Sequence, residues 1–346
     1  MPTGLVIPPR VVDAVTALGE VGLEAARVIR FEADRATVLT AETESIAVVP
    51  RRVASGGEHT ALVPGDWVAH DPSQAVVRHV LARTSELARQ AVGRRTERQI
   101  VAANIDIVFL VTSLDADFST RRLERYLTLS HESGAKPVVV LTKLSIAERA
   151  EERLAEARAV ARAVTVHAVD TLDGTNLDAI RAYLEPGITI GLVGSSGVGK
   201  STLVNHLLGE ARIATAEVRE GDGKGRHTTT RRELFVLPNG AAILDTPGMR
   251  ELALWASTES LDVTFDDIEA LAADCRFRDC VHKDEPGCAV REAAKSGALE
   301  PDRYTSYLAL RRELAAHEAR LEGTRRATDR AGSRMVREAL RDKGRK

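Results

Sequence analysis

The sequence predicts a chain of three parts: a small β-barrel near the N-terminus, a larger α/β domain, and a mostly helical C-terminal domain that holds a metal. Three observations carry this prediction. Five short β-like runs precede residue 82, strand and helix patterns alternate from residue 105, and all three cysteines fall between residues 275 and 288. Closely spaced short strands indicate a barrel or sandwich, whereas strand–helix alternation indicates a parallel sheet.

The composition is that of an ordinary globular protein. The 346 residues are 44% hydrophobic and 28% charged, with a formal net charge of −2 at pH 7. A near-neutral chain is not a polycation, so any contact with nucleic acid must come from local patches. No apolar run reaches the roughly 20 residues of a membrane span, and residues 1–10 lack the apolar core of a secretory signal. We therefore expect a cytoplasmic protein with no membrane partner.

Turn residues punctuate the first part of the chain, notably Gly56-Gly57 and Pro64-Gly65-Asp66. Five strands in about 60 residues suit an OB-type barrel, a fold often used on nucleic acids. The alternative is a small β-module that only packs on its neighbour. The predicted strands are 28–31, 36–40, 46–49, 66–69 and 75–81.

A basic linker follows at residues 83–99, with five arginines and two glutamates. A solvated helix and a patch that faces phosphates both fit this charge pattern. The α/β part then begins. Its predicted strands are 105–112, 137–142, 164–169, 188–193, 234–237 and 241–244, and its predicted helices are 121–130, 147–161, 177–184 and 202–208.

A phosphate-binding loop lies between the strand at 188–193 and the helix that follows it. The motif G-x-x-x-x-G-K-S starts at Gly194, and its glycines stand where a strand turns into a helix. Backbone N–H groups there would hold phosphate oxygens, Lys200 would reach the β- and γ-phosphates, and the Ser201 hydroxyl would bind Mg²⁺. The predicted nucleotide-binding residues of this loop are Gly194, Ser195, Ser196, Gly197, Val198, Gly199, Lys200, Ser201 and Thr202.

The tip of the strand at 241–244 carries the sequence D-x-x-G. Asp245 would hold Mg²⁺ through water, and the Gly248 N–H would meet a γ-phosphate. Alone this tetrapeptide is also a common turn. Its position some 45 residues after a phosphate-binding loop favours the nucleotide role.

Between these two motifs, residues 221–230 read GDGKGRHTTT. Thr228 or Thr229 could complete the Mg²⁺ shell, as in the switch loops of GTPases, although a Gly/Thr-rich surface loop needs no function. Ras-like GTPases orient the attacking water with a Gln just after D-x-x-G, where this chain has Met249. His227 is therefore the candidate catalytic residue, and a structural or solvent-exposed histidine is the alternative.

A candidate base-reading motif precedes the phosphate-binding loop. Thr142, Lys143, Leu144 and Ser145 follow a buried strand and fit the GTPase motif N/T-K-x-D except at its last position. Their place in the chain indicates a GTPase sheet whose chain order is permuted, with residues 168–170 as the second base-side loop. Ser145 carries no charge, so the sequence predicts weaker guanine selectivity, and relaxed base specificity or a preference for ATP is an alternative.

The cysteines and a histidine have the spacing C-x4-C-x-H-x5-C. Three thiolates and an imidazole suit a closed, structural tetrahedral zinc site. Three reduced cysteines and an unrelated histidine are the alternative. The predicted zinc ligands are Cys275, Cys280, His282 and Cys288.

A predicted helix at 304–321 leads into a basic tail. Residues 320–346 hold ten arginines or lysines against four acidic residues. Such a tail is usually disordered and solvated, and it would release counterions on meeting RNA.

Taken together, these motifs resemble the RsgA (YjeQ) family. The resemblance rests on the permuted motif order, GKGRHTTT at 223–230, DTPG at 245–248, and the cysteine motifs CRFRDCVH and EPGCAV. PGDWV at 64–68 and ANID at 103–106 add to it, and it covers about residues 25–320. It implies an OB domain, a circularly permuted GTPase domain and a zinc domain.

The resemblance further implies a GTPase that the small ribosomal subunit stimulates and that acts late in the assembly of that subunit, with rRNA as a partner. Because only 3% of residues are aromatic, we expect phosphate and shape contacts to rRNA rather than base stacking. We expect a monomer. The alternative function is a nucleotide-gated rRNA-binding protein with little turnover. The predicted parts are an N-terminal extension at 1–24, the barrel at 25–82, the linker at 83–99, the GTPase domain at 100–256, the zinc domain at 257–320 and the tail at 321–346.

Overall fold

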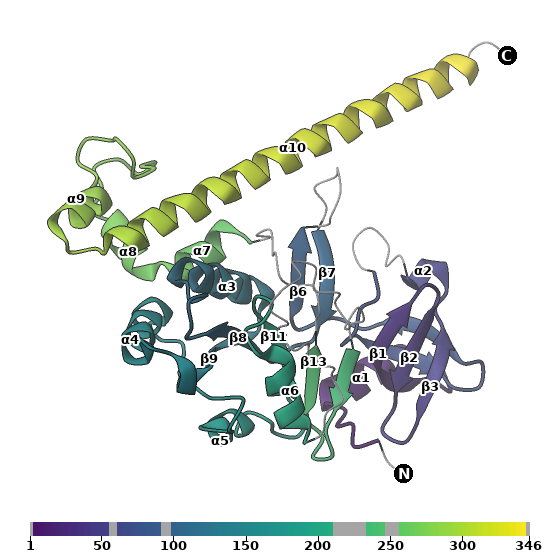
Figure 1. Cartoon of the computed structure of the whole chain (residues 1–346). Coiled ribbons are helices and arrows are strands. Elements are labelled where there is room, and N and C mark those ends of the chain that lie inside the picture. The colour runs from purple at the N-terminus through teal and green to yellow at the C-terminus, as the bar shows by residue number, and fades with distance from the viewer. Residues whose placement is uncertain (1–2, 55–60, 91–97, 210–232, 246–255, 344–346) are drawn as a thin grey trace, which may run out of the picture. The chain divides into compact units, whose positions relative to one another are not determined.

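The structure is a computed structural model that describes residues 3–54, 61–90, 98–209, 233–245 and 256–343. The chain forms two compact units, whose elements are labelled in Figure 1. The first unit comprises Met1–Ala88 with Ile100–Leu252, and the second comprises Arg89–Gln99 with Ala253–Lys346. No helix in the described ranges is long and apolar enough to cross a membrane.

The N-terminal strands close into a barrel with the order β1-β2-β3-β5-β4, which confirms the predicted barrel. Alternate side chains fill its interior, and those of Val28, Val38, Val68 and Val77 are fully buried. Trp67 lies outside this core, in a separate apolar cluster with residues of the short helix α1. The sequence did not predict this helix. The elements are α1 (Pro9–Ala17), β1 (Glu24–Glu32), β2 (Arg35–Leu39), β3 (Glu44–Val48), α2 (Arg51–Ala54), β4 (Trp67–Asp71) and β5 (Val76–Val80).

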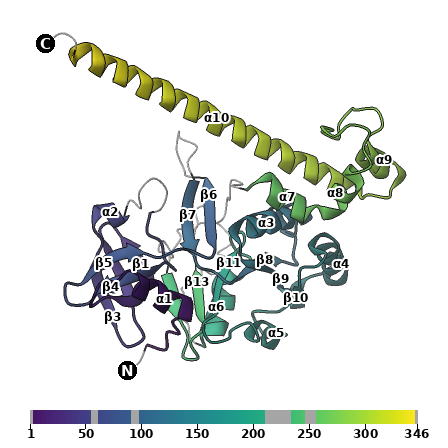
Figure 2. The same ribbon diagram turned by 180° about the vertical axis from the view of Figure 1, so that it is seen from behind.

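The linker after the barrel is not helical at the residues that the structure describes, 83–90 and 98–99. It contains two strands, β6 (Glu86–Gln90) and β7 (Arg98–Ala103), which pair with each other as a two-stranded sheet (Figure 2). The helical alternative for residues 83–99 is therefore wrong in the described part of that segment. The charge pattern did not predict these strands, because the buried residues Leu87 and Ala88 lie between charged neighbours.

The α/β part is a six-stranded sheet with the order β10-β9-β8-β11-β13-β12. The predicted parallel sheet is confirmed from β8 to β11, and β13 extends it in parallel, whereas the edge strand β12 runs antiparallel to β13. Its strands are β8 (Ile107–Ser113), β9 (Lys136–Thr142), β10 (Val166–Ala168), β11 (Thr189–Val193), β12 (Glu233–Val236) and β13 (Ala242–Asp245).

Helices cover both faces of this sheet (Figure 1). Because side chains alternate along a strand, Phe109 and Val111 of β8 share one face, where they pack in a single cluster with Leu177 and Leu203 from α5 and α6. Helix α3 lies on the opposite face, against β8 and β9, with α4 beside it. These helices are α3 (Thr120–Ser133), α4 (Ala150–Ala161), α5 (Leu177–Arg181) and α6 (Lys200–Leu208).

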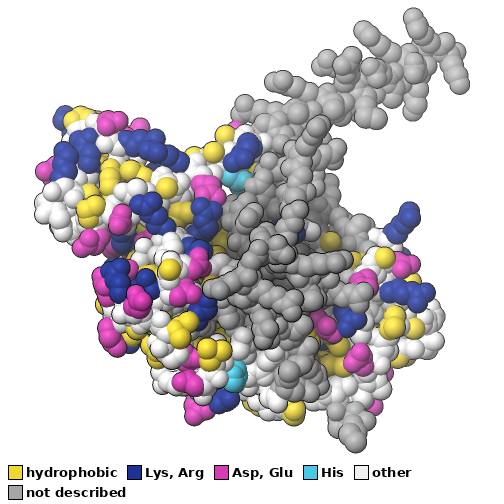
Figure 3. Space-filling model, in the orientation of Figure 1, with side chains coloured by type: hydrophobic (Ala, Val, Ile, Leu, Met, Phe, Trp, Pro, Cys, Tyr) yellow, Lys and Arg dark blue, Asp and Glu magenta, His cyan; other side chains and the backbone are white. Residues whose placement is uncertain are grey.

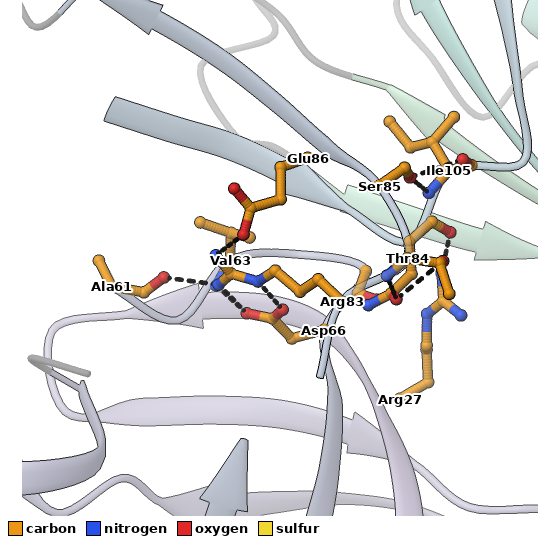
Figure 4. A network of polar contacts seen from close by, with 11 residues as sticks. Arg27, Ala61, Val63, Asp66, Arg83, Thr84, Ser85, Glu86 and Ile105 are labelled. Carbon is orange, nitrogen blue, oxygen red and sulfur yellow. Dashed lines mark hydrogen bonds and ion pairs between the residues drawn. The ribbon is translucent and has the colours of Figure 1, made fainter. Parts of the chain in front are cut away.

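A buried polar network joins the barrel to the strands that follow it (Figure 4). The Arg83 guanidinium contacts both carboxylate oxygens of Asp66, at 2.6 and 2.8 Å, and both side chains are almost fully buried. Gly65 must be glycine, because its φ is +92° and a Cβ there would lie 2.2 Å from the Ala103 carbonyl oxygen. The PGDW segment therefore fixes the barrel against the start of the α/β part.

The second unit is helical around a loop that contains the cysteines. Phe265 and Tyr307 pack edge to face with ring centroids 5.4 Å apart, and the Arg303 guanidinium lies 4.6 Å from the centre of the Phe265 ring. Arg303 also forms a bidentate ion pair with Asp267. The helices are α7 (Thr258–Thr264), α8 (Asp266–Ala272), α9 (Ala289–Ser296) and α10 (Pro301–Lys343). Helix α10 thus continues well beyond the predicted end at residue 321.

Candidate nucleotide site and metal centre

The phosphate-binding loop lies between β11 and α6, as predicted. Gly194 leaves the strand so close to β8 that a Cβ would lie 2.2 Å from the Val111 carbonyl oxygen. Gly199 precedes the helix with a φ of +91°, a conformation that other residues rarely adopt. The loop therefore folds with its backbone close to the sheet, and α6 begins at Lys200 with its first N–H groups facing the loop.

Lys200 bends back over this loop. Its ammonium group donates a hydrogen bond of 2.7 Å to the Gly194 carbonyl oxygen and another bond to the Ser195 carbonyl oxygen. Ser201 follows at the second position of the helix and is half-buried. The cation and the hydroxyl group thus lie at a helix N-terminus, where phosphate oxygens and their metal ion bind favourably.

Asp245 ends β13, the strand next to β11. Its carboxyl group is almost fully buried, and burial raises the pKa of Asp245, while the positive charge of Lys200 opposes that rise. Parallel neighbouring strands end at the same edge of the sheet, so Asp245 and the phosphate-binding loop lie together there. This placement agrees with the predicted role near the metal ion.

Thr142 connects the base-side loop to the phosphate-binding loop. Its hydroxyl group lies 2.6 Å from the Val198 carbonyl oxygen, although the two residues are far apart in sequence. Lys143 follows with a φ of +61°, and its ammonium group contacts the Asp115 carboxylate at 2.7 Å. The structure therefore brings the predicted base motif and phosphate motif to one edge of the sheet.

Ser145 has an acidic neighbour, Asp170, which the sequence placed in the second base-side loop without giving it a role. The Ser145 N–H and hydroxyl group lie 2.8 and 2.5 Å from the same Asp170 oxygen, Oδ2. Asp170 follows β10, the strand paired with β9, so the two residues end adjacent parallel strands. A sequence signal for this contact was available, because the first base-side loop lacks a carboxylate and the second one contains Asp170.

The four predicted metal ligands form one cluster. Their ligand atoms all lie within 4.8 Å of one another, and His282 Nδ1 lies 3.6 Å from Cys275 Sγ and 3.5 Å from Cys288 Sγ. A tetrahedral ion with ordinary zinc–sulfur and zinc–nitrogen bond lengths would hold such atoms about 3.6 Å apart. The donor set and its spacing therefore fit a tetrahedral metal ion.

The protein also supports the ligands of this cluster from outside. The Arg291 N–H points at Cys288 Sγ at 3.4 Å, where the thiol caps the N-terminus of α9. The Tyr304 hydroxyl group donates a 2.6 Å hydrogen bond to the His282 carbonyl oxygen. Such contacts orient metal ligands before an ion binds.

Comparisons with known proteins agree with this geometry. A model of the RsgA GTPase family matches residues 80–255. The chain belongs to the RsgA GTPase family. It is 44% identical over 279 residues to "Small ribosomal subunit biogenesis GTPase RsgA 2" of Vibrio vulnificus (strain CMCP6), and this alignment covers 81% of this chain and 79% of the relative. It is 48% identical over 264 residues to "Small ribosomal subunit biogenesis GTPase RsgA" of Xanthomonas axonopodis pv. citri (strain 306), covering 76% of this chain and 72% of the relative.

Two solved structures share the fold of this RsgA-family chain. YjeQ from Thermotoga maritima matches with a TM-score of 0.62 and 25% identity, covering 85% of this chain and 99% of that one. YloQ, described as a circularly permuted GTPase, matches with a TM-score of 0.60 and 24% identity, covering 85% and 96%. The permuted order read from the sequence is confirmed, and family membership makes the chain a GTP hydrolase.

Some predicted site residues of this RsgA-family chain lie outside the described residues. They are His227, Thr228, Thr229 and Gly248. Their assignments stay predictions.

Proposed function

We propose that this chain is a GTPase that acts in late assembly of the small ribosomal subunit, that the subunit stimulates its turnover, and that it binds rRNA. The observation that carries this proposal is the 44–48% identity, over at least 76% of the chain, to proteins named as small ribosomal subunit biogenesis GTPases. A monomer in the cytoplasm suits this role, and we propose the part boundaries that the sequence predicts.

Exposed arginine, lysine and apolar side chains of the cysteine loop support the rRNA partner, beside the exposed acids Asp279 and Asp284. In the cysteine loop Arg276, Arg278 and Lys283 are exposed, together with Phe277 at 42% and Val281 at 45%. Figure 3 shows Lys and Arg side chains gathered with apolar ones on this part of the second unit. Arginine and lysine side chains beside apolar contacts suit a surface that binds the phosphates of folded RNA.

The nucleotide site supports hydrolysis by positioning and charge. Backbone N–H groups of 194–202 and the Lys200 ammonium group would hold the phosphates, and Gly248 would meet the γ-phosphate. Ser201 would bind Mg²⁺ directly, Asp245 through water, and Thr228 or Thr229 would complete the shell; Mg²⁺, when bound, neutralises charge on the phosphate oxygens. A water molecule oriented by His227 would attack the γ-phosphorus as the bond to the β-phosphate oxygen breaks.

Turnover assays with and without purified small subunits test the proposal. We expect subunits to raise the rate of GTP hydrolysis and to raise ATP hydrolysis much less. Lys200→Ala should abolish both basal and stimulated turnover. Equal rates with and without subunits would contradict the ribosomal role, while a lack of GTP turnover in both conditions would favour the binding-protein alternative.

His227→Ala tests the catalytic assignment. We expect subunit-stimulated turnover to fall about tenfold or more, because the loss of a general base or water-orienting group typically lowers the rate ~10²–10⁴-fold. GDP affinity should change little, since the phosphates are held by other groups. Unchanged turnover would show that a group other than His227 orients the water.

For the metal centre we propose one structural zinc ion, held by Cys275, Cys280, His282 and Cys288. Three thiolates and one imidazole fill a tetrahedral shell, so no coordination position is left for a catalytic water.

A further inference from the structure

The GTPase motif N/T-K-x-D places an aspartate at the end of the first base-side loop. In this chain that position is a serine, and an aspartate lies on the second base-side loop instead. The first loop ends in Ser145, which carries no charge. The second loop carries Asp170, and the two residues are in direct contact through Ser145 Oγ and Asp170 Oδ2 at 2.5 Å.

The direction of this hydrogen bond follows from the chemistry of the groups. An ionised carboxylate only accepts hydrogen bonds, so the Ser145 hydroxyl hydrogen must point to Asp170. Asp170 also accepts from the Ser145 N–H at 2.8 Å and, through Oδ1, from the Leu172 N–H at 2.7 Å. Burial raises the pKa of Asp170, but the bonds from Ser145 and from backbone N–H groups outweigh it, so the pKa lies below its usual value and the group stays ionised.

Exposure separates the two side chains. Asp170 is 1% exposed, whereas Ser145 is exposed. Ser145 is therefore open to a nucleotide base, whereas the carboxylate behind it is not. With its hydrogen committed to Asp170, Ser145 Oγ presents only lone pairs to the outside.

We propose that Ser145 and Asp170 together form the guanine reader of this chain, with Ser145 as the contact and Asp170 as the positioning residue. Guanine offers N1–H and an exocyclic amino group, both donors, to the oxygen. Adenine offers an acceptor at N1 and would face lone pairs with a negative charge behind them. This inference rests on the proposed assignment of residues 142–145 to the base.

Binding of fluorescently labelled GDP and ADP to the full chain tests the pair. Ser145→Ala and Asp170→Asn should each lower GDP affinity about tenfold, as for one lost bond to a charged group, with ADP affinity unchanged or higher. Ser145→Thr keeps the hydroxyl group and should retain most of the preference. Asp173→Asn is the matched control, because it removes an exposed charge from the same loop, and it should stay within about twofold.

The reciprocal exchange sharpens the test. Ser145→Asp alone places a second carboxylate against Asp170, so the two groups repel and GDP affinity should not rise. Adding Asp170→Ser restores one acid and one hydroxyl group in swapped positions. We expect the double variant to bind GDP at least as tightly as the unmodified protein.

The outcomes distinguish the proposed Ser145–Asp170 pair from the assignment of residues 142–145 to the base. If Ser145→Ala lowers the GDP preference but Asp170→Asn behaves like Asp173→Asn, the pair is overturned and the loop assignment stands. If Ser145→Ala, Asp170→Asn and Lys143→Ala all leave both nucleotides unaffected, the base is read elsewhere. Equal losses for GDP and ADP would indicate damage to the fold and would also overturn the pair, because a reader must change the ratio.

Discussion

Single residues decide how closely the phosphate-binding loop approaches the sheet. Gly194 and Gly199 are required for different reasons, one by the nearby Val111 carbonyl group and the other by its left-handed backbone. The Ser195 hydroxyl group in the same loop makes an exposed hydrogen bond of 3.0 Å to Asp117. Positions that only glycine can occupy therefore lie within a few residues of one that has room for a side chain.

Gly194→Ala should destabilise the first unit. Because the new Cβ would lie 2.2 Å from a backbone oxygen, β8 or β11 must shift, and we expect the free energy of unfolding to fall by about 1–3 kcal/mol. Urea unfolding measures this loss. Ser195→Ala is the control, with an expected change within about 0.5 kcal/mol. A similar small change for Gly194→Ala would contradict the close approach.

The Lys143–Asp115 ion pair predicts a specific dependence of stability on pH. Burial raises the pKa of Asp115, but bonds from Lys143, Ser113 and a backbone N–H bring it to about 2. This lies below the unfolded value of about 3.9, so the stabilisation is present above pH 4 and is lost as the pH falls towards 2.

Asp115→Asn should remove that part of the acid sensitivity. At pH 7 we expect a loss of about 1 kcal/mol in the free energy of unfolding, since the pair is partly solvated, and little difference from the unmodified protein near pH 2. Urea titrations from pH 2 to 7 measure both. Asp178→Asn, whose side chain is 97% exposed, should leave the curve unchanged. If the free energies of unfolding of Asp115→Asn and the unmodified protein differ by the same amount at every pH, the ion-pair explanation is refuted.

At the scale of elements, strand β1 attaches the barrel to the α/β sheet through two arginines. Arg27 is buried, donates to the Asn104 carbonyl oxygen at 2.8 Å and to the Thr189 hydroxyl at 3.2 Å, and lies 4.5 Å from the centre of the Trp67 ring. Thr189 starts β11, which leads into the phosphate-binding loop. Arg30 pairs with Glu233 of β12 and is about one-third exposed.

These two arginines should contribute very differently to stability. Arg27→Met leaves the Asn104 carbonyl group buried without its donor, and we expect a loss of about 2–4 kcal/mol in urea unfolding. Arg30→Met breaks an exposed pair and should cost less than about 1 kcal/mol. Burial lowers the pKa of Arg27 to about 10, so the cation persists at neutral pH. Equal costs for both variants would mean that burial does not distinguish the two attachments.

At the scale of the whole molecule, we expect the second unit to depend on the proposed zinc ion, because its core is small. Its helices surround the loop with the four predicted ligands, and Phe265, Tyr307 and Leu310 are among its buried side chains. Small domains of this kind commonly need a metal ion in order to fold. The first unit has its own barrel and sheet cores and needs no such support.

Cys280→Ser should therefore act on one unit only. We expect elemental analysis of the full chain to find one zinc per molecule, and the variant to lose it and expose residues 257–320 to limited proteolysis. Fragments from the first unit should stay protected in the same digest. Full zinc occupancy in a Cys275→Ser/Cys288→Ser double variant would show that the ion binds elsewhere.

The sequence by itself determined the parts whose signals are local. Glycine spacing between a strand and a helix predicted the phosphate-binding loop, strand–helix periodicity predicted the sheet, and the spacing of three cysteines and a histidine predicted the metal cluster. Each signal is local because hydrophobic period and turn chemistry are set within one or two elements. The order of the motifs along the chain was enough to predict the permutation.

Only the tertiary structure decided which distant residues meet. Asp170 contacts Ser145 because β9 and β10 are parallel neighbours, and Arg27 reaches Thr189 because the barrel packs against the start of β11. The antiparallel edge strand β12 and the pairing of β6 with β7 likewise depend on strand order. A residue's own neighbours in sequence do not encode such contacts, since strand pairing and the packing of whole elements bring them together.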